Sequence, residues 1–123
     1  MPKKIMIIDD EEDMRIYLET VFQKAGYATE TAINGEDALA RLDDITPDLI
    51  TLDILMPQKS GLKFFQMLRN GTTTANVPVV VVSGVSGHSD FFDKDALGGP
   101  TVFMDKPIEP NLLLARAKEL LGE

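Results

Sequence analysis

The sequence contains no cysteine and only one histidine, His88. The absence of cysteine excludes disulfides, thiolate metal sites and cysteine nucleophiles, and a single histidine is too few for a histidine-based zinc site. Long apolar runs are also missing near the start: only Ile5–Ile8 separates Lys4 from Asp9, which is too short for a signal sequence or a membrane span. We therefore expect a cytoplasmic protein that has no membrane partner.

Basic residues are scarce. Twelve Lys and Arg stand against twenty Asp and Glu, which gives a formal net charge of −8. This charge opposes binding to phosphate backbones and to anionic membrane surfaces. We expect no direct contact with nucleic acid.

The length and composition are those of a small globular protein. The chain has 123 residues, of which 44% are hydrophobic and 26% charged, so neither disorder nor a fibrous repeat is indicated. A chain of this size buries roughly two-thirds of its unfolded surface and can form one core. One domain is expected.

Short apolar runs without polar alternation recur along the chain. Such runs are typical of parallel strands that are covered on both faces of a sheet. A weaker strand is expected near Tyr27–Thr31, and the four clear runs are Ile5–Ile8, Leu49–Leu52, Val77–Val82 and Thr101–Met104.

Helical patterns lie between these runs. Apolar residues from Met14 to Ala25 follow the spacing of one helix face, and Gly26 is placed to end that helix. The other expected helices follow Asn34-Gly35, begin near Ser60, lie within Gly84–Pro100 (a short one) and begin at Pro110.

Strand and helix thus alternate five times, which predicts an α/β sandwich built on a five-stranded parallel sheet with right-handed crossovers. Open sheets of this kind bind ligands beyond the carboxyl ends of their strands, near the point where the winding reverses. The residues at the strand ends are therefore the candidates for a functional site.

The predicted strands end in residues that can carry chemistry. Asp9 and Asp10 follow the first run and Asp53 follows the third-strand run, while Ser83 and Lys106 close the last two. Carboxylates that lie close together repel one another unless a cation is present. Oxygen ligands without imidazole or thiolate indicate Mg²⁺.

Each of these residues alone is typical of a helix cap, a turn or a solvated surface charge. Their occurrence at successive strand ends favours a shared functional site.

At this point the sequence resembles the receiver domain of the response regulator family, and the resemblance covers essentially all of residues 1–123 as one receiver domain. The motifs that carry it are Asp9-Asp10-Glu11, Leu52–Pro57 with Gly61, Ser83-Gly84 and Phe103–Pro107. The resemblance implies a (βα)5 flavodoxin-like fold with strand order 2-1-3-4-5.

The resemblance also implies roles for individual residues. Asp53 is the expected phosphoacceptor, a nucleophile that forms an acyl phosphate. Mg²⁺ is the expected cofactor, held by Asp10 directly, by Asp9 mainly through water, by Asp53 and by the backbone carbonyl of Leu55. Lys106 is expected to hold a phosphoryl oxygen, and its bond to the following proline is expected to be cis.

Two further residues are expected to convert phosphorylation into a change of shape. The hydroxyl of Ser83 would turn onto the phosphoryl group, and Phe103 would swing inward to fill the vacated space. The face formed by the fourth helix, fifth strand and fifth helix would change as a result. The expected partners are a histidine kinase or phosphotransfer protein upstream and a protein target or output domain downstream.

Several alternatives remain. The chain could be a receiver fragment of a longer regulator, or a receiver that docks without being phosphorylated. An Mg²⁺-dependent phosphatase with an aspartyl-phosphate intermediate uses similar residues, although here the first-strand acids are adjacent and the nucleophile lies on the third strand. A flavodoxin-like nucleotide binder needs a phosphate loop after the first strand, where this chain has acids. We expect a switch with only self-phosphorylation and self-dephosphorylation chemistry, not an enzyme.

Overall fold

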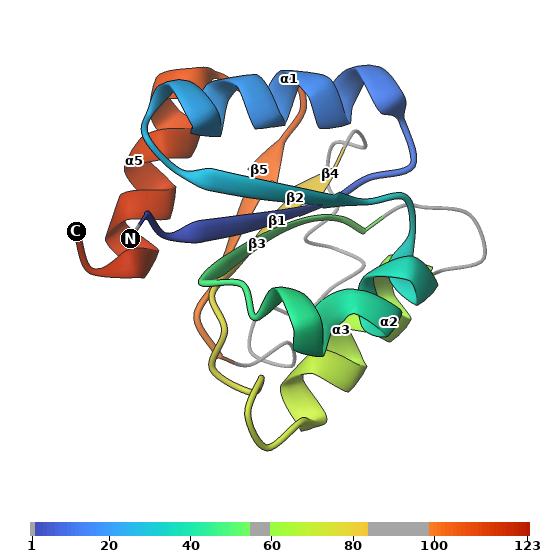
Figure 1. The fold of residues 1–123 in the computed structure, drawn as a ribbon. Coiled ribbons are helices and arrows are strands. Elements are labelled where there is room, and N and C mark those ends of the chain that lie inside the picture. The colour runs from blue at the N-terminus through green and yellow to red at the C-terminus, as the bar shows by residue number, and fades with distance from the viewer. Residues whose placement is uncertain (1, 55–59, 84–98) are drawn as a thin grey trace.

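A computed structural model describes residues 2–54, 60–83 and 99–123, and in these ranges five strands and four helices follow one another (Figure 1). The short helix expected within Gly84–Pro100 lies outside the described residues. The elements are β1 (Lys4–Ile8), α1 (Glu12–Lys24), β2 (Ala28–Ala32), α2 (Gly35–Ile45), β3 (Leu49–Asp53), α3 (Ser60–Asn70), β4 (Val79–Ser83), β5 (Thr101–Asp105) and α5 (Pro110–Leu121).

The five strands form one parallel sheet in the order β2-β1-β3-β4-β5, which confirms the predicted fold class and strand order. The winding direction reverses between β1 and β3, because β2 lies outside β1 and the later strands lie beyond β3. The carboxyl ends of β1 and β3 therefore flank the crevice where such sheets bind ligands.

Helices cover both faces of the sheet (Figure 1). Helices α1 and α5 pack on one face, where Phe22 and Leu113 join a core cluster with Ile7 and Val80 of the strands. Helices α2 and α3 pack on the other face around a second cluster that includes Phe64. Burial on both faces explains why the strands lack polar alternation.

Local signals fix the helix ends. The side chain of Asn34 caps α2 by accepting a hydrogen bond from the backbone N–H of Asp37 at 2.8 Å. Gly26, which follows the C-cap residue of α1, has a φ of 96°, as expected of a glycine that ends a helix. Pro110 is the first residue of α5, and Glu109 caps that helix.

Several predicted strand boundaries differ from the observed ones by one or two residues, and two of these differences have a clear local cause. β4 begins at Val79, because Pro78 has no N–H to give to the ladder, although its carbonyl accepts from Ile50 N at 2.9 Å. β2 begins at Ala28, because the N–H of Tyr27 closes the end of α1 by donating to the carbonyl of Phe22.

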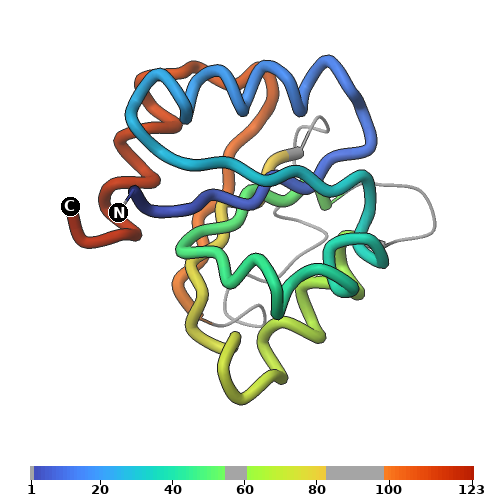
Figure 2. The backbone as a smooth tube through the Cα atoms, in the orientation of Figure 1, coloured from blue at the N-terminus to red at the C-terminus, as the bar shows by residue number. Residues whose placement is uncertain are grey.

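The two ends of the chain lie side by side at the edge where the strands begin (Figure 2). Lys3 Nζ donates to the carbonyl of Leu121 at 3.2 Å and ties the start of β1 to the end of α5. Among the described residues, no helix has the length and apolar character needed to cross a bilayer.

Candidate metal and phosphoryl site

Side-chain alternation brings the strand-end residues to one face of the sheet. Asp53 lies on the same face as Leu49, and Asp9 on the same face as Ile7, because residues two or four apart in a strand point the same way. Leu49 and Ile7 belong to the core under α1 and α5. Lys106 reaches this place from the end of β5.

Four carboxylates meet there and form what we call the acidic cluster: Asp9, Asp10, Glu11 and Asp53. One carboxylate oxygen from each lies within 4.8 Å of all the others. Asp9 is 1% exposed and Asp53 5% exposed, whereas Asp10 and Glu11 are exposed. Two charges are therefore buried next to two that solvent reaches.

Lys106 is the cation that faces this cluster. Its Nζ lies 3.5 Å from Asp53 Oδ2, 3.7 Å from Asp9 Oδ2 and 3.7 Å from Glu11 Oε1. The peptide bond from Lys106 to Pro107 is cis, as expected. One ammonium thus contacts three carboxylates and leaves excess negative charge at the strand ends.

The pKa values reflect this excess. Burial raises the pKa of Asp9 above its ordinary value, and the charges of Asp53 and Glu11 raise it further, against the opposing effects of the Glu11 N–H bond and Lys106. Burial alone would lower the pKa of Lys106, but the carboxylates of Asp53, Asp9 and Glu11 together raise it. The cluster is therefore a site that favours an added positive charge.

Backbone contacts hold Asp9 in place. Its Oδ1 accepts from the N–H of Glu11 at 2.9 Å, and its own N–H donates to the carbonyl of Ala32 at 3.2 Å. Arg15 Nη1 donates to the carbonyl of Asp9 at 2.8 Å. The end of β1 is thus fixed to both β2 and α1.

A glycine brings α3 close to the end of β3. A Cβ atom at residue 61 would lie 2.6 Å from the backbone oxygen of Asp53 and 2.9 Å from Cα of Ile54. No side chain fits at that separation, so Gly61 lets the first turn of α3 rest on the backbone that presents Asp53. This gives a structural reason for the glycine in the motif.

The donor set fits a hard divalent cation. Carboxylate oxygens are the ligands that Mg²⁺ prefers, usually one or two of them with water completing the octahedron. Among the described residues, the cluster contains neither imidazole nor thiolate. A cation there would also relieve the repulsion between Asp9 and Asp53.

The structure brings together four of the residues predicted from the sequence: Asp9, Asp10, Asp53 and Lys106. Ser83 ends β4, paired in register with Asp105, and its side chain lies outside the described part of the chain. Leu55 also lies outside it. Phe103 is half-buried on the opposite face, packed against the core of α2 and α3.

The sequence reasoning missed two features of the site. It named Glu11 only as part of the motif Asp9-Asp10-Glu11 and gave it no role, yet the Glu11 carboxylate contacts Lys106; its position directly after Asp9 and Asp10 was the available signal. It also gave no role to Thr51, which is 1% exposed and whose hydroxyl has no hydrogen-bond partner among the described residues. Thr51 lies on the same face as Asp53, two residues earlier in β3.

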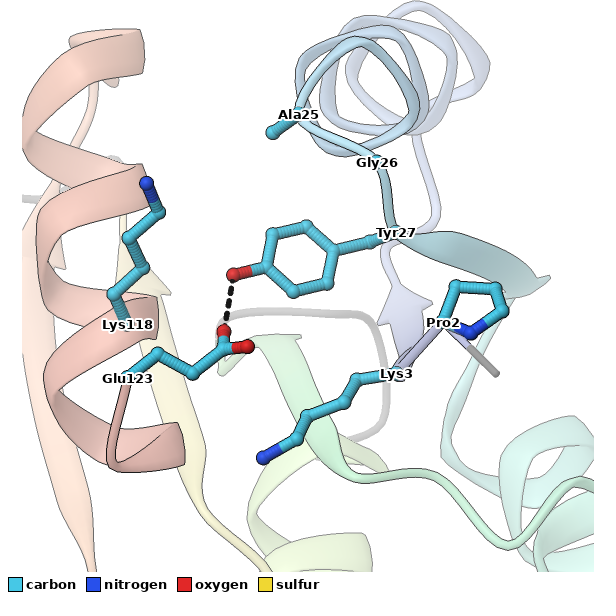
Figure 3. Close-up of a pocket in the computed structure, with 7 residues that line it drawn as sticks. All are labelled: Pro2, Lys3, Ala25, Gly26, Tyr27, Lys118 and Glu123. Atoms are coloured by element: carbon cyan, nitrogen blue, oxygen red, sulfur yellow. Dashed lines mark hydrogen bonds between the residues drawn. The ribbon is translucent and has the colours of Figure 1, made fainter.

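A separate cleft of about 490 Å³ lies at the other edge of the sheet (Figure 3). Tyr27 projects into it and donates from its hydroxyl to Glu123 Oε1 at 2.7 Å. Lys3 and Lys118 line the same cleft, so its charges are mixed. It shares no residue with the acidic cluster.

The fold and the cluster together define a class of protein, and the comparisons agree with it. The model of the response regulator receiver domain family matches residues 5–118. The chain belongs to this family. Receiver domains serve mainly as signalling switches rather than as classical enzymes.

Particular relatives show the same kinship. The chain is 34% identical to Protein Rrf1 of Nitratidesulfovibrio vulgaris over 99% of its length and 85% of that protein. It is 34% identical to Protein PilG of Pseudomonas aeruginosa over 94% of its length and 84% of that protein. The chemotaxis protein CheY4 of Vibrio cholerae has a similar structure, with a TM-score of 0.87 and 26% identity over 98% of this chain and 99% of that one.

Proposed function

We propose that this protein is a phospho-accepting switch of a two-component or phosphorelay system, with Asp53 as the phosphoacceptor. The observation that carries the proposal is the Asp53 carboxylate itself. It is 5% exposed, it lies at the carboxyl end of the central strand, and its Oδ2 is 3.5 Å from Lys106 Nζ within a cluster of acids.

The proposed reaction moves one phosphoryl group. A lone pair of an Asp53 oxygen forms a bond to phosphorus while the phosphorus–nitrogen bond of a phosphohistidine breaks. The electron pair of that bond returns to the imidazole of the donor, which takes up a proton from solvent. The donor in this proposal is a histidine kinase or a phosphotransfer protein.

Mg²⁺ would be held by the carboxylates of Asp9, Asp10 and Asp53 and by the backbone carbonyl of Leu55. When bound, it supplies positive charge that lets a phosphoryl group approach the acids. Asp9 and Asp53 are both almost fully buried, which orients them before the ligand arrives. The same burial makes the site unfavourable without a cation.

Lys106 and Ser83 would bind the phosphoryl oxygens and transmit the event. Hydrogen bonds to charged groups are worth roughly 1.5–3 kcal/mol each, so two supply about 3–6 kcal/mol. Moving a two-state switch from 1:99 to 99:1 needs about 5.5 kcal/mol. The proposed output is therefore a population shift, in which Phe103 repacks against the α2 and α3 core.

The proposed unit is residues 1–123 as one receiver domain that acts on a downstream protein target or output domain. A longer regulator is the alternative, since the chain spans 26% of Response regulator PleD of Caulobacter vibrioides and 49% of PhoP of Bacillus subtilis. A downstream partner would engage the face that β5 and α5 share.

Incubation with Mg²⁺ and a small acyl phosphate tests the proposal. Intact-mass measurement should show the gain of one phosphoryl group, and peptide mapping should place it on Asp53. Asp53→Asn should take no label. Asp105→Asn is the matched control, because Asp105 also ends a strand of the sheet but is exposed, and it should be labelled like the unsubstituted protein.

The same experiment separates a switch from a phosphatase. A switch takes up about one phosphoryl group per chain and needs Mg²⁺ to do so. Release of many phosphates per chain would favour the phosphatase with an aspartyl-phosphate intermediate. Label on any residue other than Asp53 would contradict both readings.

A further inference from the structure

Arg69, in the last turn of α3, donates hydrogen bonds to two loops at the edge where the strands begin, opposite the acidic cluster. Its Nη1 donates to the carbonyl oxygens of Ala75 and Val77, at 3.0 and 2.6 Å. Its Nη2 donates to the carbonyl oxygen of Pro100 at 3.2 Å and to the hydroxyl of Thr101 at 3.0 Å. One planar group therefore joins the loop before β4 to the start of β5.

The surroundings of Arg69 are built to hold it. Its guanidinium carbon lies 5.0 Å from the centre of the Phe65 ring, in cation–π contact. A Cβ atom at residue 99 would lie 2.6 Å from Arg69 Nε, so Gly99, whose φ is 67°, leaves the room that the side chain needs. Burial lowers the pKa of Arg69, although arginine remains charged at neutral pH.

The strands that Arg69 anchors are the two whose far ends carry Ser83 and Lys106. The carbonyl of Pro100 accepts from the N–H of Val79 at 2.9 Å as well as from Arg69, which links the starts of β4 and β5. The two strands are then hydrogen-bonded along their whole length, as far as the pair Ser83 and Asp105. Arg69 thus fixes this pair of strands at one end, and residues of the candidate site lie at the other end.

We infer that Arg69 is a positioning residue for the phosphorylation of Asp53. By fixing the starts of β4 and β5, it sets where Lys106 stands relative to the carboxylate. The kinetic part of this inference rests on the proposed function. A displacement of about 1 Å at a reacting group can cost up to about a hundredfold in rate, so a small slip of β5 is enough to matter.

Arg41 provides a matched control. It is also a helix arginine that braces a strand: it lies in α2, donates to the carbonyl of Thr31 in β2, and contacts the carboxylates of Glu30 and Asp37. β2 carries no residue of the acidic cluster. Arg41→Met should therefore loosen a strand without moving Lys106.

The first experiment measures anchoring without any phosphorylation. Amide hydrogen exchange should become about tenfold faster in β4 and β5 of Arg69→Met, with β1 and β3 unchanged. Arg41→Met should change β2 instead. Arg69→Lys keeps the charge but loses the planar set of guanidinium donors, so its exchange rates in β4 and β5 should be intermediate. It provides a milder variant if Arg69→Met folds poorly.

The second experiment measures the rate of labelling by an acyl phosphate and, by calorimetry, the affinity for Mg²⁺. Arg69→Met should lower the labelling rate by about tenfold, while Mg²⁺ affinity stays unchanged. The reason is that the carboxylates of Asp9, Asp10 and Asp53 lie at the ends of β1 and β3, whereas the guanidinium donates to the loop before β4 and to the start of β5. Adding Arg69→Met to Lys106→Met should cause no further loss, since Arg69 acts through Lys106. A residue that only stabilises the fold would add its effect in both backgrounds.

The outcomes separate this inference from the proposed function. Faster exchange spread evenly over all strands, an unchanged labelling rate, or an undiminished further loss in the Lys106→Met background would each overturn the positioning role. If the unsubstituted protein takes no label on Asp53, the proposed function fails. Arg69 then has no phosphorylation to position, and the exchange experiment still decides whether it anchors β4 and β5.

Discussion

The two edges of the sheet, where the strands begin and where they end, differ in how their charged side chains are paired. Where the strands begin, cationic side chains donate to backbone carbonyls: Lys3 to Leu121, Lys4 to Ile45, and Arg69 to Ala75, Val77 and Pro100. Where the strands end, four carboxylates gather and three of them, on Asp9, Glu11 and Asp53, contact Lys106. These cations of the first edge are paired with backbone carbonyls, whereas negative charge is in excess at the second.

Helix direction explains half of this contrast. The helices run back against the strands, so their carboxyl ends, with unpaired carbonyls and a partial negative charge, lie where the strands begin. Lys3 and Lys4 bind carbonyls at the ends of α5 and α2. Helix direction does not explain the acids. Carboxylates that are concentrated at one edge repel one another and lower the stability of the fold, which favours a role in binding rather than in folding. Substitutions at the two edges should therefore have opposite effects on folding.

The largest effect is expected at the first edge. Arg69→Met should lower the free energy of unfolding by about 3 kcal/mol, because it removes a charged donor from several partly buried carbonyl acceptors at once. Arg41→Met should lower it by less than about 1 kcal/mol, since its ion pairs are exposed. Urea denaturation measures both. Equal losses would contradict the special role of Arg69 in the fold.

The opposite sign is expected at the second edge. Asp9→Asn should raise the free energy of unfolding by about 1–2 kcal/mol at neutral pH without Mg²⁺. The reason is that the pKa of Asp9 is raised in the fold, so the neutral form is favoured there. Mg²⁺ should stabilise the unsubstituted protein more than the variant.

The pH dependence of that gain checks its cause. A raised pKa means that the folded protein binds this proton more tightly than the unfolded chain does. The cost of Asp9 is complete above its folded-state pKa and disappears as the pH falls to 3.8, the ordinary value. The advantage of Asp9→Asn should shrink over the same range, and a gain that is independent of pH would contradict the electrostatic explanation.

A smaller gain is expected beside the cluster. Thr51→Val should raise the free energy of unfolding by about 1 kcal/mol, because it removes a buried hydroxyl that has no described partner and keeps the shape of the side chain. Thr101→Val is the control: its hydroxyl accepts from Arg69, so this change should destabilise. Thermal unfolding of both variants gives the two signs. Destabilisation by Thr51→Val would show that its hydroxyl is bonded.

The smallest effect belongs to the cleft at the first edge. Burial and the bond to Glu123 raise the pKa of Tyr27 to about 12 from 10.0, so its stabilising contribution is complete below pH 10.0 and is lost as the pH rises toward 12. Tyr27→Phe should cost about 0.5 kcal/mol at neutral pH. In a pH titration followed by phenolate absorbance, the step near pH 12 should disappear in Tyr27→Phe and remain in Tyr17→Phe.

The positions of the acids at the ends of predicted strands were enough to predict the acidic cluster. Asp9, Asp53 and Lys106 are far apart in sequence, but parallel strands must deliver their carboxyl ends to one edge, so their meeting follows from the order of the elements. The fold class was predicted from the alternation of strands and helices, and the strand order from the resemblance to the receiver family. Boundaries failed where a local hydrogen bond decided, as at Pro78, which cannot donate, and at Tyr27, whose N–H is used by α1.

The features that sequence reasoning missed depend on contacts that no local pattern encodes. Arg69 is typical of a cation in the last turn of a helix, and no local pattern shows that carbonyls of the loop that follows it and of Pro100, 31 residues away, converge on its side chain. Thr51 fits the composition of a strand, so the lack of a partner for its hydroxyl within the described residues is visible only once its neighbours are placed. The contact between Glu11 and Lys106 could be recognised only once the position of Lys106 was known.

The hydrogen bond from Lys3 to the end of α5 has a practical consequence. The bond holds both termini at the edge where the strands begin, whereas Asp53 ends β3 at the opposite edge. A fluorescent protein or an affinity tag fused to either end should therefore leave the acidic cluster open to solvent. Immobilised protein should therefore take up a phosphoryl donor as readily as free protein, and a dye pair on the two ends should report on α5 moving against β1.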